Sequence, residues 1–263
     1  MAANSILTLI ALFPLTAPAQ DLTDVEAIVG RANLAAYYAG DDGRAEVRMT
    51  ITDPGGRERV RQFTILRRDR EDGVDQDYVV LFSRPADVRN TVFLVNKHVG
   101  TDDDRWLYLP DLDLVKRIAA GDKRTSFVGS HFVYEDVSGR GVEEDEHELL
   151  ETTAESYVIK NTPKDPGSVE FSSWTVWVDK TTFVPTKMEY LDESGEVYRR
   201  IEALSVEDIG GHPTVTQMRV SDLRGGGQTV SQFRNLEYDL GIPEDVFTER
   251  TLRNPPRQWF SGR

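Results

Sequence analysis

The chain has 263 residues and a formal net charge of −14 at pH 7. This charge repels the phosphates of nucleic acids and argues against broad electrostatic binding to anionic membranes. The length suits one large β domain with a buried core, and the lack of cysteine in the sequence excludes disulfide bonds, thiol redox chemistry and thiolate metal sites.

The first residues predict export. Residues 1–20 carry no charge, and the apolar run at 6–15 is too short to span a bilayer comfortably. Ala17, Pro18 and Ala19 then fit the small-residue cleavage site of a secretory signal peptide. We therefore predict a signal peptide over 1–19, a single mature domain over 20–263, and a location in the periplasm of a Gram-negative bacterium. The alternative is a buried N-terminal helix.

One helix is expected next, over residues 21–39. Thr23 and Glu26 form a capping-box pattern at its start, and the Gly-Asp-Asp-Gly run at 40–43 ends it. The apolar residues between these points recur at spacings of three and four, as on one face of a helix: Leu22, Val25, Ile28, Val29, Ala32 and Ala36.

The rest of the chain reads as β structure. Val47, Met49 and Ile51 alternate with polar residues, and turn-forming runs at 54–56, 192–196 and 224–228 separate further alternating segments. No alternation of strands with helices is present, so the pattern predicts one large antiparallel sheet. We expect about ten or eleven strands, a number at which open sheets curl.

Two of these segments, 78–82 and 91–95, are apolar on both faces. A strand has that composition when both of its faces are covered. We expect the N-terminal helix to provide the missing cover, with the stretch 125–137 as the second candidate.

No arrangement of residues selects a catalytic mechanism. The Gly-Ser-His run at 129–131 lacks the frame of a nucleophile elbow, and the acids at 102–104, 111 and 113 lack the spacing of a calcium loop. His131 lies four residues before Glu135, so a shared metal is an alternative to an ordinary hydrogen-bonded histidine. The acidic run at 143–151 is typical of a solvated loop. We predict no catalytic residue, no metal and no cofactor; a hydrolase is the least favoured alternative.

The stretch 105–141 is aromatic and basic within an acidic chain. Its residues 125–137 suit a short helix or ordered loop folded against the sheet. We expect its aromatic residues to line a hydrophobic cavity and its lid, and its basic residues to form a rim facing an anionic or amphipathic ligand. Alternatively, these cations offset Asp122, Glu135 and Asp136. The cavity and lid residues are Trp106, Tyr108, Phe127, Phe132 and Tyr134, and the rim residues are Lys116, Arg117, Lys123 and Arg124.

The same stretch carries a resemblance. Its pattern WLYLP…KRI…DKRTSFVGSHFVYED, with RPADVRNTVFLV upstream and GIPEDVFTERTL downstream, is similar to the outer-membrane lipoprotein-sorting protein family. These are the LolA-like periplasmic proteins, and the closest pattern is that of the branch associated with RND-type exporters. The resemblance covers residues 21–253.

This resemblance implies a curved, unclosed antiparallel β half-barrel whose concave face is covered by an N-terminal helix and short helices. It also implies a non-enzymatic, monomeric carrier that binds the acyl chains of a lipid or lipoprotein in a hydrophobic cavity for transport towards the outer membrane. Its partners would be an inner-membrane transporter, RND-type or other, and an outer-membrane acceptor. The alternative is a lipid- or partner-binding sensor, or an accessory subunit of an envelope transporter, on the same fold.

Overall fold

The computed structural model describes residues 21–70 and 74–260. The signal peptide expected over 1–19 lies outside these ranges. Within them, no helix is both long and apolar enough to cross a membrane.

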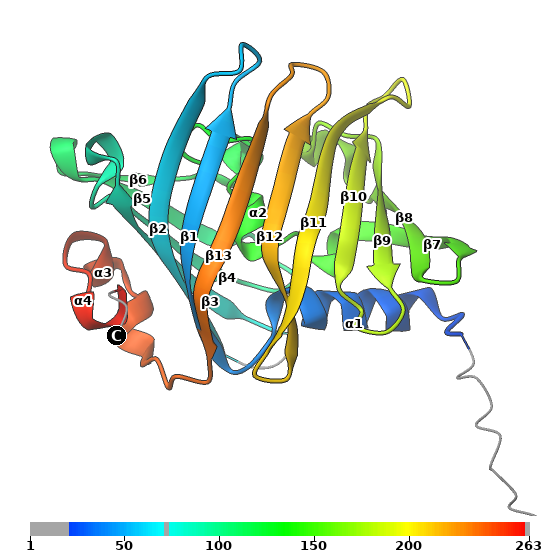
Figure 1. The fold of residues 1–263 in the computed structure, drawn as a ribbon, viewed down its shortest axis with the longest axis horizontal. Helices are drawn as coiled ribbons and strands as arrows, with labels where there is room; N and C mark the ends of the chain where they lie inside the picture. The colour runs from blue at the N-terminus through cyan, green and yellow to red at the C-terminus, as the bar shows by residue number, and fades with distance from the viewer. Residues whose placement is uncertain (1–20, 71–73, 261–263) are drawn as a thin grey trace, which may run out of the picture.

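The described chain forms one antiparallel sheet with the strand order β6-β5-β4-β3-β2-β1-β13-β12-β11-β10-β9-β8-β7 (Figure 1). The strands are β1 (Asp42–Thr52), β2 (Glu58–Asp69), β3 (Gln76–Arg84), β4 (Val92–Lys97), β5 (Asp104–Leu109), β6 (Leu114–Arg117), β7 (Asp145–Thr152), β8 (Ser156–Pro163), β9 (Ser173–Asp179), β10 (Pro185–Leu191), β11 (Val197–Ile209), β12 (His212–Asp222) and β13 (Gln228–Tyr238). The predicted mainly β, curved and unclosed fold is confirmed, because β6 and β7 remain two separate edges.

The helical elements are short, apart from the first. They are α1 (Val25–Tyr37), α2 (Glu135–Ser138), α3 (Glu249–Arg253) and α4 (Arg257–Phe260), with the 3-10 turns η1 (Ala86–Val88), η2 (Pro110–Leu112), η3 (Ala120–Asp122), η4 (Val142–Glu144), η5 (Pro166–Ser168) and η6 (Glu244–Phe247). α1 is capped by Asp24, whose carboxylate accepts hydrogen bonds from the amides of Glu26 and Ala27. The expected cap, Thr23, is therefore one residue too early.

The sheet has thirteen strands, more than the number expected. The edge strand β7 occupies most of the acidic run at 143–151, which we expected to be a solvated loop. Asp145 of β7 is buried, whereas Glu146 and Glu148 are exposed on the opposite face of this edge strand. Charged side chains on such an edge discourage pairing with other chains.

Strands β3 and β4 are covered on both faces, as their composition predicts, but not by α1. On the concave face Val80 and Phe93 pack with Phe127, which belongs to the second expected cover, 125–137. On the convex face Val79 and Leu94 pack with residues 240–260, called here the C-terminal segment. This segment contains α3 and α4, which lie outside the arc in Figure 1. We did not expect the C-terminal segment to cover the convex face of β3 and β4.

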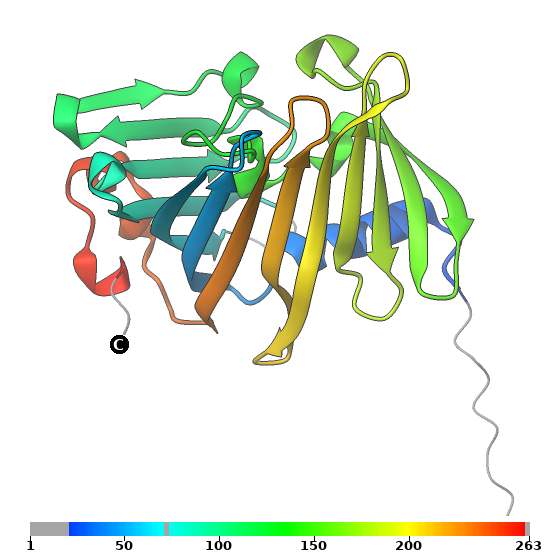
Figure 2. The ribbon, with the colours of Figure 1, turned by 45° about the horizontal axis from the view of Figure 1, so that its top comes forward.

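α1 instead lies inside the arc, towards the other end of the sheet (Figure 2). Its buried residues Ile28 and Ala32 pack against Ile159 of β8 and Val178 of β9. These contacts form a second, smaller core beside the main one, which extends from β1–β5 to β10–β12.

The C-terminal end of α1 is held by β2 and β3. The Arg67 guanidinium donates 2.7 Å hydrogen bonds to the carbonyl oxygens of Tyr37 and Gly40 and another bond to that of Ala39. Gln76 adds a 2.8 Å bond from its side-chain amide to the Tyr37 carbonyl. The last carbonyls of a helix have no partner within the helix, so Arg67 fixes the position of α1 against the sheet.

We expect Arg67→Met to reduce the free energy of unfolding by about 3 kcal/mol, because it removes a buried cation that bonds several acceptors at once. Arg68→Met is the matched control, since Arg68 is partly exposed and lies 3.8 Å from Glu244; its cost should stay under about 1 kcal/mol. Urea unfolding measures both. Equal losses in the two variants would contradict the anchoring role of Arg67.

Candidate functional site

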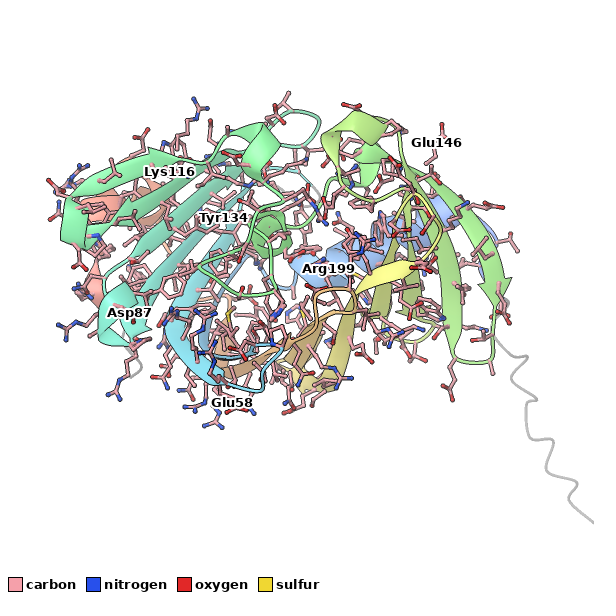
Figure 3. The ribbon with its side chains drawn as sticks, turned by 90° about the horizontal axis from the view of Figure 1, so that it is seen from above. Glu58, Asp87, Lys116, Tyr134, Glu146 and Arg199 are labelled. Carbon is pink, nitrogen blue, oxygen red and sulfur yellow. The ribbon has the colours of Figure 1, made fainter. Side chains whose placement is uncertain are left out.

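A cavity of about 360 Å³ lies between the concave face of the sheet, α1 and the connection that joins β6 to β7. Residues 118–141 of this connection, called here the cover segment, cross the open side of the arc, with Tyr134 inside it (Figure 3). Most of the cavity wall is apolar. Contributions come from β1, β2 and β3 and from all the strands β7 to β13.

Two features give the cavity its space and its adaptability. α1 faces it with Ala32, Ala35 and Ala36, whose short side chains leave room beneath the helix. The wall opposite carries all three internal methionines of the chain: Met49, Met188 and Met218. Methionine is flexible and polarizable, which suits surfaces that accept variable apolar ligands. Met49 was expected only as one apolar residue of an alternating strand, and Met188 and Met218 stand in no motif, although the small number of methionines in the sequence is a signal for them.

Phe127 and Phe132 of the cover segment line the cavity. Phe127 is 2% exposed and is the centre of an aromatic cluster, with ring centroids 5.8 Å from Phe82 and 5.4 Å from Phe93. The Tyr134 ring contacts the Phe127 ring edge-on, and their centroids are 5.7 Å apart. Three of the five predicted cavity residues are thus brought together; their contact with a ligand stays a prediction.

Trp106 and Tyr108 do not belong to this cavity. They share one face of β5, as strand alternation requires, but it is the convex face, where they pack with the C-terminal segment. The Arg253 guanidinium lies 5.5 Å from the centre of the Tyr108 ring. The prediction that they line the cavity is wrong, because the residue between them, Leu107, is the one that turns into the main core.

The four basic residues do not form one rim. Lys116 and Arg117 are exposed on the edge strand β6, whereas Lys123 and Arg124 are buried within the cover segment. The predicted continuous rim is therefore wrong. Burial of Lys123 and Arg124 is possible because acids of the same region neutralise them, which is the alternative that the sequence left open.

Glu135 is the centre of this buried charge network and is 2% exposed. Its carboxylate lies 2.9 Å from Lys123 Nζ, 3.0 Å from Arg124 Nη1 and 3.6 Å from an Arg140 nitrogen. Arg124 also pairs with Glu170 at 2.7 Å. All three partners of Glu135 belong to the cover segment, so Glu135 holds the segment's own fold together, while the Arg124–Glu170 pair joins it to its surroundings.

Two further ion pairs secure the cover segment. Arg140 pairs with Asp145 of β7 at 3.0 Å, and Arg199 of β11 pairs with Asp136 at 2.5 Å. Arg199 lies inside the arc in Figure 3. Sequence reasoning missed Arg140 and Arg199, since neither stands in a recognisable motif. Both pairs attach the segment, through side chains, to the half of the sheet that contains β11 and β7.

The pKa of the Glu135 carboxyl reflects this environment. Burial acts to raise its pKa, but the neighbouring charges of Arg124, Lys123 and Arg140 outweigh burial, and its pKa is lowered. Glu135 is thus ionised at neutral pH. The network contributes stability that depends on that charge.

The described ranges contain no cluster of three or more His, Asp or Glu side chains able to hold a metal ion. His131 does not share a metal with Glu135: its Nδ1 lies 2.8 Å from the Thr229 hydroxyl, while Glu135 is in the ion-pair network. Both ring nitrogens of His147 are also occupied, by Asn161 and the Val142 carbonyl.

A family model described as an uncharacterized protein matches residues 74–254. No curated protein matches the chain. Among solved structures, a DUF1329 family protein from Desulfovibrio piger has a TM-score of 0.79 and 32% sequence identity, covering 87% of this chain and 98% of that one. An outer-membrane lipoprotein-sorting protein domain from Vibrio parahaemolyticus has a TM-score of 0.78 and 25% identity, over 86% of this chain and 97% of that one.

The LolA superfamily protein NE2245 from Nitrosomonas europaea shares the fold, with a TM-score of 0.66 and 20% identity over 86% of this chain and 98% of that one. An open antiparallel sheet with an internal helix thus defines the LolA-like class. The chain belongs to this LolA-like family and, within it, to the DUF1329 family of its Desulfovibrio piger relative.

We expect Glu135→Gln to lower the free energy of unfolding at pH 7 by about 3 kcal/mol, because it leaves buried cations without their shared carboxylate. The lowered pKa means that the contribution of Glu135 is complete above its ordinary pKa of 4.5 and is lost as the pH falls through its folded-state value. The variant should therefore lose less stability than the wild type between pH 6 and pH 3 (about the range of carboxyl titration).

Urea unfolding at a series of pH values measures this difference. Glu146→Gln, at an exposed position of the edge strand β7, is the matched control and should follow the wild type at every pH. A Glu135→Gln variant as acid-sensitive as the wild type would show that other carboxyls cause the acid loss.

Proposed function

We propose that this protein is a non-enzymatic periplasmic carrier, which binds the acyl chains of a lipid or lipoprotein in its cavity for transport towards the outer membrane. The observation that carries the proposal is the apolar cavity beneath a cover held mainly by side-chain ion pairs. The names of the relatives, a lipoprotein-sorting domain and a LolA superfamily protein, lend it support. An inner-membrane RND-type or other transporter and an outer-membrane acceptor are the partners that such a carrier needs.

The physical demand on a carrier is simple. Each buried CH₂ group contributes about 0.8 kcal/mol, so a long acyl chain needs a continuous apolar cover while it crosses an aqueous compartment. The cavity, of about 360 Å³, is in the lower part of the usual range of ligand sites, roughly 300–1,000 Å³. A larger acyl group requires the cavity to widen.

The cover segment is the element suited to that widening. Its internal strand pairing is a single isolated bridge between Ser126 and Val133, and the turn between them has positive φ at Val128 and Gly129. We propose that Phe127 and Phe132 fill the apolar space when no lipid is bound and withdraw when an acyl chain enters. The chain then replaces the apolar surface that the phenylalanines leave, so the two states can lie within a few kcal/mol of each other.

We expect Met218→Trp to weaken the binding of a fluorescent long-chain fatty acid by about tenfold or more, because the larger ring occupies cavity space. Gln217→Trp is the matched control, since neighbouring residues of a strand point to opposite faces; it should bind like the wild type. Fluorescence titration of both variants gives the affinities. Equal binding by Met218→Trp and wild type would place the acyl chain elsewhere.

Hydrogen exchange tests the movement of the cover. We expect amides at 126–136 to exchange faster when lipid is bound, while amides of β1 and β13 stay protected. Gly129→Val should destabilise the closed, lipid-free arrangement and speed lipid uptake, because a β-branched residue is strained at the φ of +74° found there. Identical exchange at 126–136 with and without lipid would mean that the segment is a fixed part of the core.

A further inference from the structure

A second cavity, of about 330 Å³, lies on the other side of the cover segment. In contrast to the first, its wall is polar. It is formed by the end of β4, the turn between β4 and β5, and the last part of the connection to β7. Its lining includes Lys97, Arg105, Gly139, Gly141, Glu143 and Glu144.

Lys97 brings a buried positive charge to this wall. It is 4% exposed, and its ammonium donates a 2.8 Å hydrogen bond to the Ser138 carbonyl and lies 5.3 Å from the centre of the Tyr37 ring. No carboxylate among the described residues is close enough to form an ion pair with it. An ammonium has three donors, so Lys97 can bond further acceptors.

Arg105 adds a second cation. It is 2% exposed, and its Nη2 pairs with Asp103 at 2.5 Å. Its Nε and Nη1 have no hydrogen-bond partner. Both atoms are closed off from the cavity, so Arg105 acts on an anion there through its charge and not through a direct hydrogen bond.

The acids around this cavity already have other partners. Asp103 pairs with Arg105, Glu144 pairs with Lys123 at 2.8 Å, and Glu143 accepts a 2.9 Å hydrogen bond from the Gly100 amide. Glu143 and the nearby Asp102 are exposed, so solvent and salt screen their repulsion of an anion more strongly than they screen the buried cations.

The two cavities adjoin each other, because Gly139 and Gly141 line both. Gly139 has a φ of +78°, and a Cβ atom there would lie 2.5 Å from the Tyr37 ring. That ring faces the apolar cavity on one side and the Lys97 ammonium on the other. The wall between the apolar and the cationic space is therefore one aromatic ring and a glycine-containing strip of backbone.

We propose that the second cavity binds the anionic headgroup of a lipid whose acyl chain occupies the first, with Lys97 as the headgroup ligand and Arg105 as a second cation nearby. This inference rests on the proposed carrier function and narrows its substrate class to lipids with a phosphate or carboxylate near the acyl chain. A lipoprotein or a neutral lipid would gain nothing from the buried cations.

The test compares two lipids with the same acyl chain, palmitoyl lysophosphatidate and monopalmitoylglycerol, below the concentrations at which they aggregate. Displacement of a fluorescent fatty acid gives their affinities. The full chain should bind the phosphate-bearing lipid about tenfold more tightly or better.

Lys97→Met should remove that preference while the neutral lipid binds as before, and Lys97→Arg should restore most of it. Lys187→Met, a partly exposed lysine beside the Trp177 ring, is the matched control and should keep the preference.

Circular dichroism establishes that each variant is folded. If neither lipid displaces the probe, the carrier proposal fails and this one with it. If both lipids bind with equal affinity, or if Lys97→Met keeps the preference, only the headgroup site is refuted. Inorganic phosphate is the third probe. Lys97-dependent binding of phosphate without any preference for lysophosphatidate would assign the cavity to a free anion and overturn the lipid assignment.

Discussion

The constraint on which this structure depends is that its sheet curls without closing. The strands of an open antiparallel sheet of this size twist into an arc, and the concave face of that arc needs an apolar cover. α1, with 13 residues, covers only the end formed by β8 and β9. The rest of the concave face is covered by the connection between the two sheet edges. The space that neither this connection nor α1 fills is the cavity.

The way each cover is attached follows from its role. α1 is anchored by backbone carbonyls bonded to Arg67 and by a continuous apolar stripe, which suits a fixed wall. The cover segment is attached to its surroundings through the ion pairs of Arg124, Arg140 and Arg199, with little strand pairing of its own. Buried ion pairs yield little net stability over an apolar replacement, because removing charges from water is costly. They do specify one arrangement, which is what the proposed opening and reclosing of the cover requires.

The sequence predicts this fold well because strand alternation and turn residues are local properties. The doubly apolar strands β3 and β4 even show that two covers must exist. Alternation does not show which face of a strand is the outer one. Trp106 and Tyr108 share a face by their spacing, but a register shift of one residue exchanges the concave and convex sides. The convex cover by residues 240–260 depends on a contact distant in sequence.

The charged residues show the same limit. Lys116 and Lys123 look alike in the sequence, but one is exposed on an edge strand while the other is buried beside Glu135. Their difference arises from where the chain turns after β6. The second cavity was equally hidden, because Lys97 and Arg105 meet the strip at 139–141 only after the connection has crossed the arc.

The central claim is that the concave cavity carries an acyl chain, and native mass spectrometry of the protein isolated gently from its own host tests it most directly. The account predicts a population heavier than the mature polypeptide, whose added mass is lost on mild activation and corresponds to a lipid with at least one long acyl chain. Recovery of the bare polypeptide alone, under conditions that preserve lipid complexes of a known carrier, would contradict it.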